Sequence, residues 1–201
     1  MELFDNIREY RVILGSGSPR RKELLAMLDI DFEVRSAGDV DESYPADLPA
    51  EEVPLYLARK KSNAFLSGLR ENELVITADT VVICDNNVLG KPADTEEAFR
   101  MLKMLSGRKH AVVTGITVAT REIQISDTAI TEVEFAPLSD ETIREYIGRY
   151  RPMDKAGAYG IQEWIGAVAV KGINGSFYNV MGLPLHLLTT LLLRIPVRKH
   201  Q

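Results

Sequence analysis

Three neighbouring cations follow an apolar segment and a small-residue loop near the start of the chain. In chain order these are the apolar segment 11–14 (RVIL), the loop 15–18 (GSGS), and then Arg20, Arg21 and Lys22. Ser18 and Pro19 suit the N-cap and first positions of a helix, which places the cations in its first turn. The helix dipole there favours negative charge, so cations are unfavourable unless an anion joins them. The pattern predicts a phosphate cradle, and an ordinary solvated helix end is the alternative.

A carboxylate interrupts an apolar strand in the middle of the chain. Asp79 lies within the segment 74–84 (LVITADTVVIC). A carboxylate is costly to bury unless it is paired, binds a metal or faces water. Asp79 is therefore a candidate general base or Mg²⁺ ligand, and a carboxylate satisfied by a backbone group or a lysine is an equal alternative. Lys91 follows the next turn, and a cation there fits an anion site without being specific for one.

The segment 154–162 (DKAGAYGIQ) combines small residues with polar side chains of different reach. Small residues let a backbone approach a ligand closely. Asp154 and Lys155 supply opposite charges, and the amide of Gln162 can donate and accept at once, as recognition of a base edge requires. From these residues alone, a binding loop and an ordinary glycine-rich loop are equally good interpretations.

The overall charge argues against two classes of partner. The 201 residues include 24 Lys and Arg against 29 Asp and Glu, which gives a formal net charge of −5. Such a balance is unlike that of a nonspecific binder of nucleic acid or anionic membranes. The first ten residues lack a basic region followed by an apolar stretch, and polar residues and Pro184 interrupt the apolar segment 183–193. We therefore expect a cytoplasmic protein without a secretory signal.

Cysteine and histidine usage excludes further chemistries. Cys84 is the single cysteine, so no internal disulfide can form, and its apolar neighbours predict a buried structural thiol. The three histidines lack the spacing of zinc ligands. Neither a P-loop motif nor a dinucleotide-binding motif is present.

The order of elements predicts a mixed α/β fold. We expect strands at 11–14, 31–41, 74–84, 88–89, 111–119, 123–135 and 167–170, and helices from 19, at 54–69, 95–105 and 139–148, and from 183. Asp94 with Glu97, and separately Ser139, are predicted N-caps. In the helix 54–69, Lys61 lies at the edge of the apolar stripe while Lys60 points away, so Lys61 is better placed to reach an interior groove. No linker divides the chain, and a single domain over 1–201 is expected.

These segments together resemble the Maf family of nucleoside triphosphate pyrophosphatases. The matching segments are 16–25 (SGSPRRKELL), 41–42 (DE), 58–61 (ARKK), 76–82 (ITADTVV), 89–92 (LGKP), 104–110 (MLSGRKH), 114–115 (TG), 154–162 (DKAGAYGIQ) and 178–184 (YNVMGLP). They follow one another in order over nearly the whole chain, so a chance match is not a credible explanation.

The resemblance implies hydrolysis of a nucleoside triphosphate to the monophosphate and pyrophosphate, with Mg²⁺ or Mn²⁺. It also implies an elongated mixed-sheet fold related to inosine triphosphate pyrophosphatases, with two lobes around a central cleft. Asp79 matches the family's proton acceptor, and Arg20, Thr80 and Gln162 match positions that determine substrate choice. Other matched cleft positions are Ser16, Arg21, Glu42, Lys61, Lys91, Asp154 and Lys155. Glu42 and Asp79 would hold the metal ion, and whether Asp79 is base, ligand or both stays open.

The form of the segment 154–162 resembles the branch that prefers dTTP and UTP, with modified pyrimidine nucleotides as further candidates. The alternatives are a nucleotide-binding septation regulator with little turnover and a 7-methyl-GTP pyrophosphatase. Two departures from the family pattern bear on substrate choice: residues 150–152 read YRP, and Glu163 and Trp164 follow Gln162 where the family usually has glycine. The expected partner is a nucleoside triphosphate, together with a second copy in a homodimer.

Overall fold

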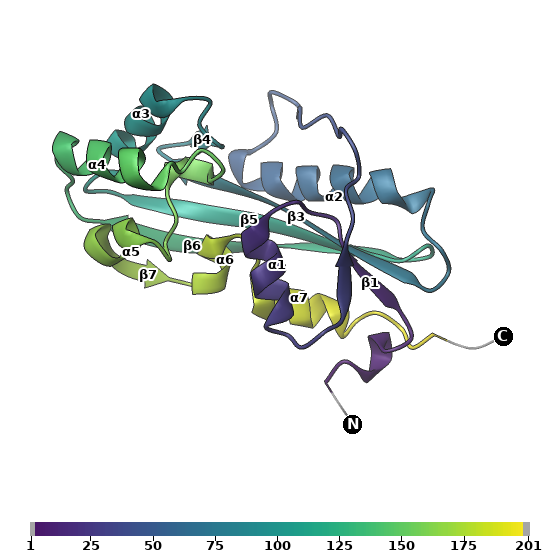
Figure 1. Cartoon of the computed structure of the whole chain (residues 1–201). Helices are drawn as coiled ribbons and strands as arrows, with labels where there is room; N and C mark the ends of the chain where they lie inside the picture. Colours follow the sequence, from purple (N-terminus) through teal and green to yellow (C-terminus); the bar gives the residue numbers. More distant parts are fainter. Residues whose placement is uncertain (1–2, 199–201) are drawn as a thin grey trace. The chain divides into compact units, whose positions relative to one another are not determined.

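The computed structural model (Figure 1) describes residues 3–198, and their contacts divide into two compact units. The first unit comprises the chain up to Asp79, residues 114–129, and the chain from Gly182 onward. The second comprises residues 80–113 and 130–181. Strands β3 (Glu73–Cys84), β5 (Lys109–Ala119) and β6 (Gln124–Phe135) contribute residues to both. The single domain expected over 1–201 stays a prediction.

The strands form one mixed sheet in the order β2-β1-β3-β5-β6-β7, with β4 paired to β3. Strand β1 (Arg11–Leu14) runs parallel to β2 (Phe32–Val34) and to β3. Strand β4 (Asn87–Leu89) is antiparallel to β3, and β7 (Val170–Asn174) is antiparallel to β6. Parallel neighbours need crossover connections, which α1 (Pro19–Ala26) and α2 (Val53–Leu66) supply. The α/β class predicted from the sequence is confirmed.

In the first unit, α2 covers one face of the sheet, and α1 and α7 (Leu185–Leu192) lie together on the other (Figure 1). The predicted apolar stripe of α2 is confirmed at Ala58, Ser62 and Phe65, which are buried, and the helix ends at Leu66 rather than Leu69. Two contacts hold α2 close to the strands. Thr77 donates a hydrogen bond to the Ala58 carbonyl at 2.7 Å, and a Cβ at Gly115 would lie 2.4 Å from Leu55 Cα. Only glycine permits that approach of β5 to α2.

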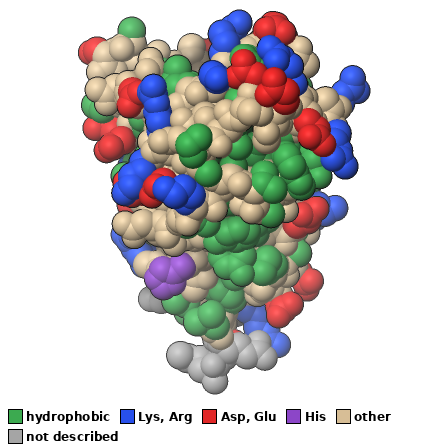
Figure 2. All heavy atoms as spheres, turned by 90° about the vertical axis from the view of Figure 1, so that its left-hand side faces the viewer, with side chains coloured by type: hydrophobic (Ala, Val, Ile, Leu, Met, Phe, Trp, Pro, Cys, Tyr) green, Lys and Arg blue, Asp and Glu red, His purple; other side chains and the backbone are tan. Residues whose placement is uncertain are grey.

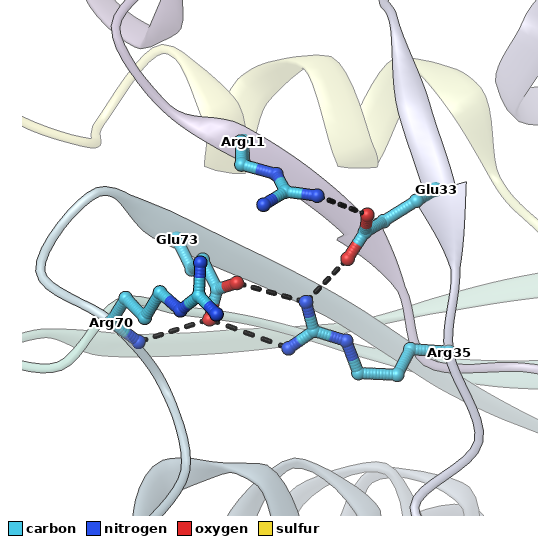
Figure 3. A network of polar contacts seen from close by, with 5 residues as sticks. All are labelled: Arg11, Glu33, Arg35, Arg70 and Glu73. Carbon is cyan, nitrogen blue, oxygen red and sulfur yellow. Dashed lines mark hydrogen bonds and ion pairs between the residues drawn. The ribbon is translucent and has the colours of Figure 1, made fainter.

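A network of ion pairs joins the first residues of β1 and β3 to Glu33 in β2 and to Arg35, which follows β2 (Figure 3). Arg35 contacts both Glu33 and Glu73, reaching Glu73 Oε1 at 2.8 Å, and Arg11 pairs with Glu33 at 2.7 Å. The side chain of Glu73 is only 1% exposed and also accepts a hydrogen bond from the Arg70 backbone N–H. The hydrogen bond from Arg35 is the main cause that lowers the pKa of Glu73 to about 2. A buried carboxylate is thus kept charged by a partner from a neighbouring segment.

Two helices of the second unit begin at the predicted caps. At α3 (Thr95–Leu105), Asp94 accepts a hydrogen bond from the Glu97 backbone N–H at 2.8 Å, and Glu97 accepts one from the Ala93 backbone N–H. At α4 (Asp140–Tyr150), Ser139 accepts one from the Thr142 backbone N–H. The two helices pack side by side (Figure 1) over an apolar core that includes the buried Cys84.

Two local predictions are wrong. The segment 167–170 is not a strand, because α5 (Trp164–Ala169) occupies it and β7 begins at Val170. Gly166 allows this helical turn to pack on the preceding loop, since a Cβ there would lie 1.7 Å from the Ile161 carbonyl oxygen. The strand expected to run from residue 31 into an acidic loop at 39–45 covers only Phe32–Val34. The predicted start of α1, with Ser18 as N-cap residue and Pro19 in the first turn, is confirmed, although the Ser18 side chain makes no capping hydrogen bond.

Three short 3₁₀ helices, at Asp5–Ile7, Ala50–Glu52 and Ala156–Ala158, and the helix α6 (Phe177–Met181) complete the described elements. No helix in residues 3–198 is long and apolar enough to cross a membrane.

The second unit exposes several large apolar side chains, at Ile130, Val168, Ile173, Phe177 and Tyr178. Figure 2 views the side on which α3, α4 and α5 are drawn in Figure 1, and shows hydrophobic side chains exposed among charged ones. Such groups can be covered when another protein surface packs on them. The homodimer expected from the sequence stays a prediction.

Candidate functional site

The loop before α1 is organised by Ser16 and Arg21. The hydroxyl of Ser16 accepts hydrogen bonds from the Ser18 backbone N–H and from Arg21 Nη1, both at 3.3 Å. Arg20 is half-buried and Lys22 is exposed. The small-residue loop therefore contacts Arg21, one of the predicted phosphate-binding cations, through the Ser16 hydroxyl.

Arg21 also ties two other segments of the first unit to this loop. Its Nη1 donates to the Ala78 carbonyl oxygen at 2.7 Å, and its Nε donates to the Gly182 carbonyl oxygen at 2.8 Å. Burial lowers the pKa of Arg21, and the negative charge of Asp79 opposes that shift. Arg21 thus holds the end of β1, the middle of β3 and the start of the C-terminal segment in one arrangement.

Asp79 is paired with a lysine from α2. The ammonium of Lys61 lies 2.5 Å from Asp79 Oδ1 and 2.9 Å from Glu42 Oε1. The side chains of Lys61 and Asp79 are 16% and 14% exposed, whereas that of Glu42 is 57% exposed. Lys60 instead pairs with the exposed Asp41 at 2.8 Å. The structure therefore places Lys61, rather than Lys60, between the two predicted metal-ligating carboxylates.

The pair of carboxylates fits a divalent cation by its donor chemistry. Mg²⁺ takes oxygen ligands, commonly one or two carboxylates together with substrate phosphates. Glu42 and Asp79 supply that number of carboxylates around one point, and the Lys61 ammonium that bridges them here would have to give way to the cation. In residues 3–198 no cluster of three or more His, Cys, Asp or Glu side chains has a metal-binding arrangement.

The second unit holds the remaining predicted residues. Thr80 follows Asp79 directly in β3, Lys91 is exposed after β4, and Gln162 is exposed at the end of the glycine-rich segment. That segment is tied to the chain before Lys91, because the Gly157 backbone N–H donates to the Gly90 carbonyl oxygen at 3.0 Å.

The segment 154–162 is closely packed where it meets β3. Gly157 has a φ of +67°, and a Cβ there would lie 2.9 Å from Val82. Lys155 is buried and pairs with Asp154 at 2.8 Å. Trp164 is half-buried against the apolar core of this unit, and its effect on base choice stays a prediction.

Two buried groups near this segment were not selected from the sequence. His110 Nε2 and the Tyr159 hydroxyl lie 2.8 Å apart, and both rings pack edge-on against Phe135. Burial lowers the pKa of His110 to about 4, so its ring is neutral at pH 7. The sequence analysis excluded His110 as a zinc ligand and included it only within the matched segment 104–110, and no local pattern marks an aromatic partner 49 residues away.

The second missed group is the hydrogen-bonded pair Tyr146 and Glu163. Its only signal in the sequence is that Glu163 stands where the resembling family usually has glycine. The pair lies against Lys155, since Glu163 Oε1 is 3.0 Å from the lysine ammonium.

Comparison with known families decides what kind of protein carries this arrangement. A family model described as Maf-like protein matches residues 11–195. The chain belongs to the Maf family. The Maf resemblance inferred from the sequence motifs is confirmed.

Bacterial Maf relatives are similar over nearly their whole length. The dTTP/UTP pyrophosphatase of Porphyromonas gingivalis is 56% identical over 188 residues, which cover 92% of this chain and 94% of that protein. The dTTP/UTP pyrophosphatase of Bacteroides thetaiotaomicron is 55% identical, covering 91% and 95%. That of Flavobacterium johnsoniae is 48% identical, covering 90% and 93%.

Among solved structures, a HAM1 protein from Coxiella burnetii aligns with 91% of this Maf chain and 98% of its own, at 14% identity and a TM-score of 0.45.

Proposed function

We propose that this Maf protein hydrolyses dTTP and UTP to the nucleoside monophosphate and pyrophosphate. The observation that carries the proposal is the cluster of Glu42, Lys61 and Asp79, with distances of 2.5 and 2.9 Å, in a chain 56% identical to a dTTP/UTP pyrophosphatase. Modified pyrimidine nucleotides with the same triphosphate are further candidate substrates.

Asp79 is the group that orients or deprotonates the attacking water. Lys61 fixes its carboxylate through a contact at 2.5 Å, and Arg21 fixes the adjacent backbone through the Ala78 carbonyl. A general base must be held within hydrogen-bonding reach of the proton that it accepts. The two contacts supply that restraint from α2 and from α1.

The loop 15–18, together with Arg20 and Arg21 at the start of α1, binds the triphosphate tail. Ser16 and Arg20 contact phosphate oxygens there, while Arg21 shapes the loop and adds positive charge. Positive charge and backbone N–H groups stabilise the pyrophosphate as it departs. Glu42 and Asp79 would hold a divalent cation, which would neutralise charge on the phosphates.

In the second unit, Lys91, Asp154 and Lys155 are proposed substrate-binding residues. Thr80 and Gln162 are proposed specificity residues, as is Arg20 in the first unit. The exposed amide of Gln162 suits this role, because thymine and uracil present both donors and acceptors on one edge. We further propose a cytoplasmic location, which the single, buried and free cysteine supports.

The deciding experiment measures pyrophosphate release with Mg²⁺ from dTTP, UTP, CTP, 7-methyl-GTP and modified pyrimidine triphosphates. We expect turnover of dTTP and UTP. Preference for 7-methyl-GTP would overturn the proposed substrate class. Tight nucleotide binding without any turnover would overturn the enzymatic function in favour of a nucleotide-binding regulator.

A further inference from the structure

The side chain of Glu163 does not cap α5, the helix that it precedes. Glu163 is the N-cap residue of α5, yet its side chain makes no capping hydrogen bond. The side chain is only 19% exposed and folds back over the preceding loop. A Cβ at Gly160 would lie 2.8 Å from Glu163 Cδ and 3.0 Å from the Lys155 side chain, so both side chains pack over this glycine.

The carboxylate of Glu163 connects α4 to the segment 154–162. Its Oε2 accepts a hydrogen bond from the Tyr146 hydroxyl, and its Oε1 lies 3.0 Å from Lys155 Nζ. The Tyr146 hydroxyl in turn accepts a hydrogen bond from the Gly160 backbone N–H at 3.1 Å. Both the backbone and a charged side chain of the segment are therefore held through Glu163 and Tyr146.

Lys155 lies between an inner and an outer carboxylate. Its side chain is 10% exposed and contacts Glu163, which is 19% exposed, and Asp154, which is 55% exposed. A nearly buried ammonium is stable only while it stays paired, and removing one partner of a buried pair is strongly unfavourable. Glu163 is the partner on the protein side, so it determines where Lys155 is held and how Lys155 presents Asp154.

We propose that Glu163, held by Tyr146, is a positioning residue that fixes Lys155 and Asp154 for nucleotide binding. The inference rests on the proposed function, because it assigns Lys155 and Asp154 to the substrate. The inference also assigns a function to Glu163, which stands where the family usually has glycine. Its carboxylate supports the segment 154–162 through its contacts with Lys155 and Tyr146.

The test compares Glu163→Gln and Tyr146→Phe with the wild type. Glu163→Gln keeps the size of the side chain and removes its charge, and Tyr146→Phe removes the hydroxyl that holds it. Glu134→Gln is the matched control, since Glu134 pairs at 2.5 Å with Lys171 in an exposed ion pair of the same unit. Four quantities are measured: acylation of Lys155 by an N-hydroxysuccinimide acetate, KM and kcat for dTTP, and the Kd of dTTP by calorimetry.

We expect Glu163→Gln to raise acylation of Lys155 several-fold and to raise KM and Kd for dTTP about 10-fold, because misplaced binding groups weaken productive binding. The value of kcat should stay within about twofold, because Asp79 and Lys61 are untouched. Tyr146→Phe should shift the same quantities less, and Glu134→Gln should shift none. A purely structural defect would instead lower the amount of active enzyme, and so reduce kcat at unchanged KM.

Unchanged acylation of Lys155 in both variants would overturn the inference, as would an unchanged KM and Kd for dTTP. If the wild type releases no pyrophosphate, the proposed function fails, and the inference is then decided by acylation and by the Kd of dTTP alone. The two failures are distinguishable, since the first is seen in the wild type and the second only in the variants.

Discussion

Arg21 donates a hydrogen bond at 2.7 Å to the carbonyl oxygen of Ala78, the residue immediately before Asp79. The guanidinium also reaches Ser16 and the Gly182 carbonyl. A side chain that the sequence presents as one more cation for phosphate is therefore also a support for the proposed base. A lysine cannot make this set of directed hydrogen bonds, because it lacks the planar guanidinium.

Substituting Arg21 with lysine should consequently impair turnover although the charge is kept. We expect kcat/KM for dTTP to fall about 10²-fold, since small displacements of a catalytic group carry costs of that order. Steady-state pyrophosphate release measures the effect. Lys22→Ala is the control, because Lys22 is exposed in the same helical turn, and it should leave turnover within about twofold. Equal losses in the two variants would contradict a specific function for Arg21.

Removing the charge of Asp79 should reduce turnover more strongly. Asp79→Asn keeps the size of the side chain but can neither accept a proton nor pair with Lys61, and we expect kcat to fall about 10²–10⁴-fold. Asp41→Asn is the matched control, because Asp41 pairs with the neighbouring Lys60 at 2.8 Å in an exposed position. If Asp79→Asn retained wild-type kcat, Asp79 would not be the base.

The ion-pair network in Figure 3 should make stability depend on pH in the acidic range. Folding lowers the pKa of Glu73 from 4.5 to about 2, chiefly through Arg35, so between these values the unfolded chain binds more protons than the folded chain. The contribution of Glu73 is therefore fully present above pH 4.5 and is lost as the pH falls towards 2. Urea unfolding at pH 7 and pH 3 measures this loss.

The corresponding variant is Glu73→Gln, which should be less stable than the wild type at pH 7 and should lose less stability on acidification. Glu132→Gln is the control, since Glu132 pairs with Lys109 in an exposed position, with side chains 46% and 59% exposed. A Glu73→Gln profile parallel to that of the wild type would show that another group governs the acid transition.

The end of α4 offers a stabilising substitution. Arg151 adopts a left-handed conformation with φ of 47°, which costs a non-glycine residue about 1–2 kcal/mol. Glycine adopts it freely but is more flexible when unfolded, so Arg151→Gly should stabilise the protein by about 0.5–1 kcal/mol. Thermal unfolding should show a Tm a few degrees higher. Arg149→Gly, inside the same helix, should lower Tm, and a decrease in both variants would contradict the strain argument.

Local signals predicted the elements that depend on neighbours in sequence. Asp94 and Ser139 each accept a hydrogen bond from the backbone N–H three residues further along the chain, so the local sequence is enough to predict these caps. The strand predicted at 167–170 was wrong because the helix found there depends on Gly166 packing against Ile161. Local strand propensity gives no information on such a tertiary contact.

The candidate site residues show the same difference between positions set by local sequence and positions set by tertiary contacts. Periodicity within α2 distinguishes Lys61 from Lys60, but the position of Glu42 depends on a long loop whose path no local pattern specifies. Arg35 and Glu73 meet only through the pairing of separate strands, and Tyr146 meets Glu163 across 17 residues. Contacts of that kind require the register of the fold, which a single sequence does not contain.

The missing side chain at Gly115 sets a limit on how this protein can be altered. Because a Cβ there would lie 2.4 Å from Leu55, any other residue would push α2 outward and carry Lys61 with it. A library aimed at new substrates should therefore keep position 115 invariant, although the residue itself has no reactive group. The close backbone packing at Gly115 therefore limits which substitutions this protein tolerates, just as its charged residues do.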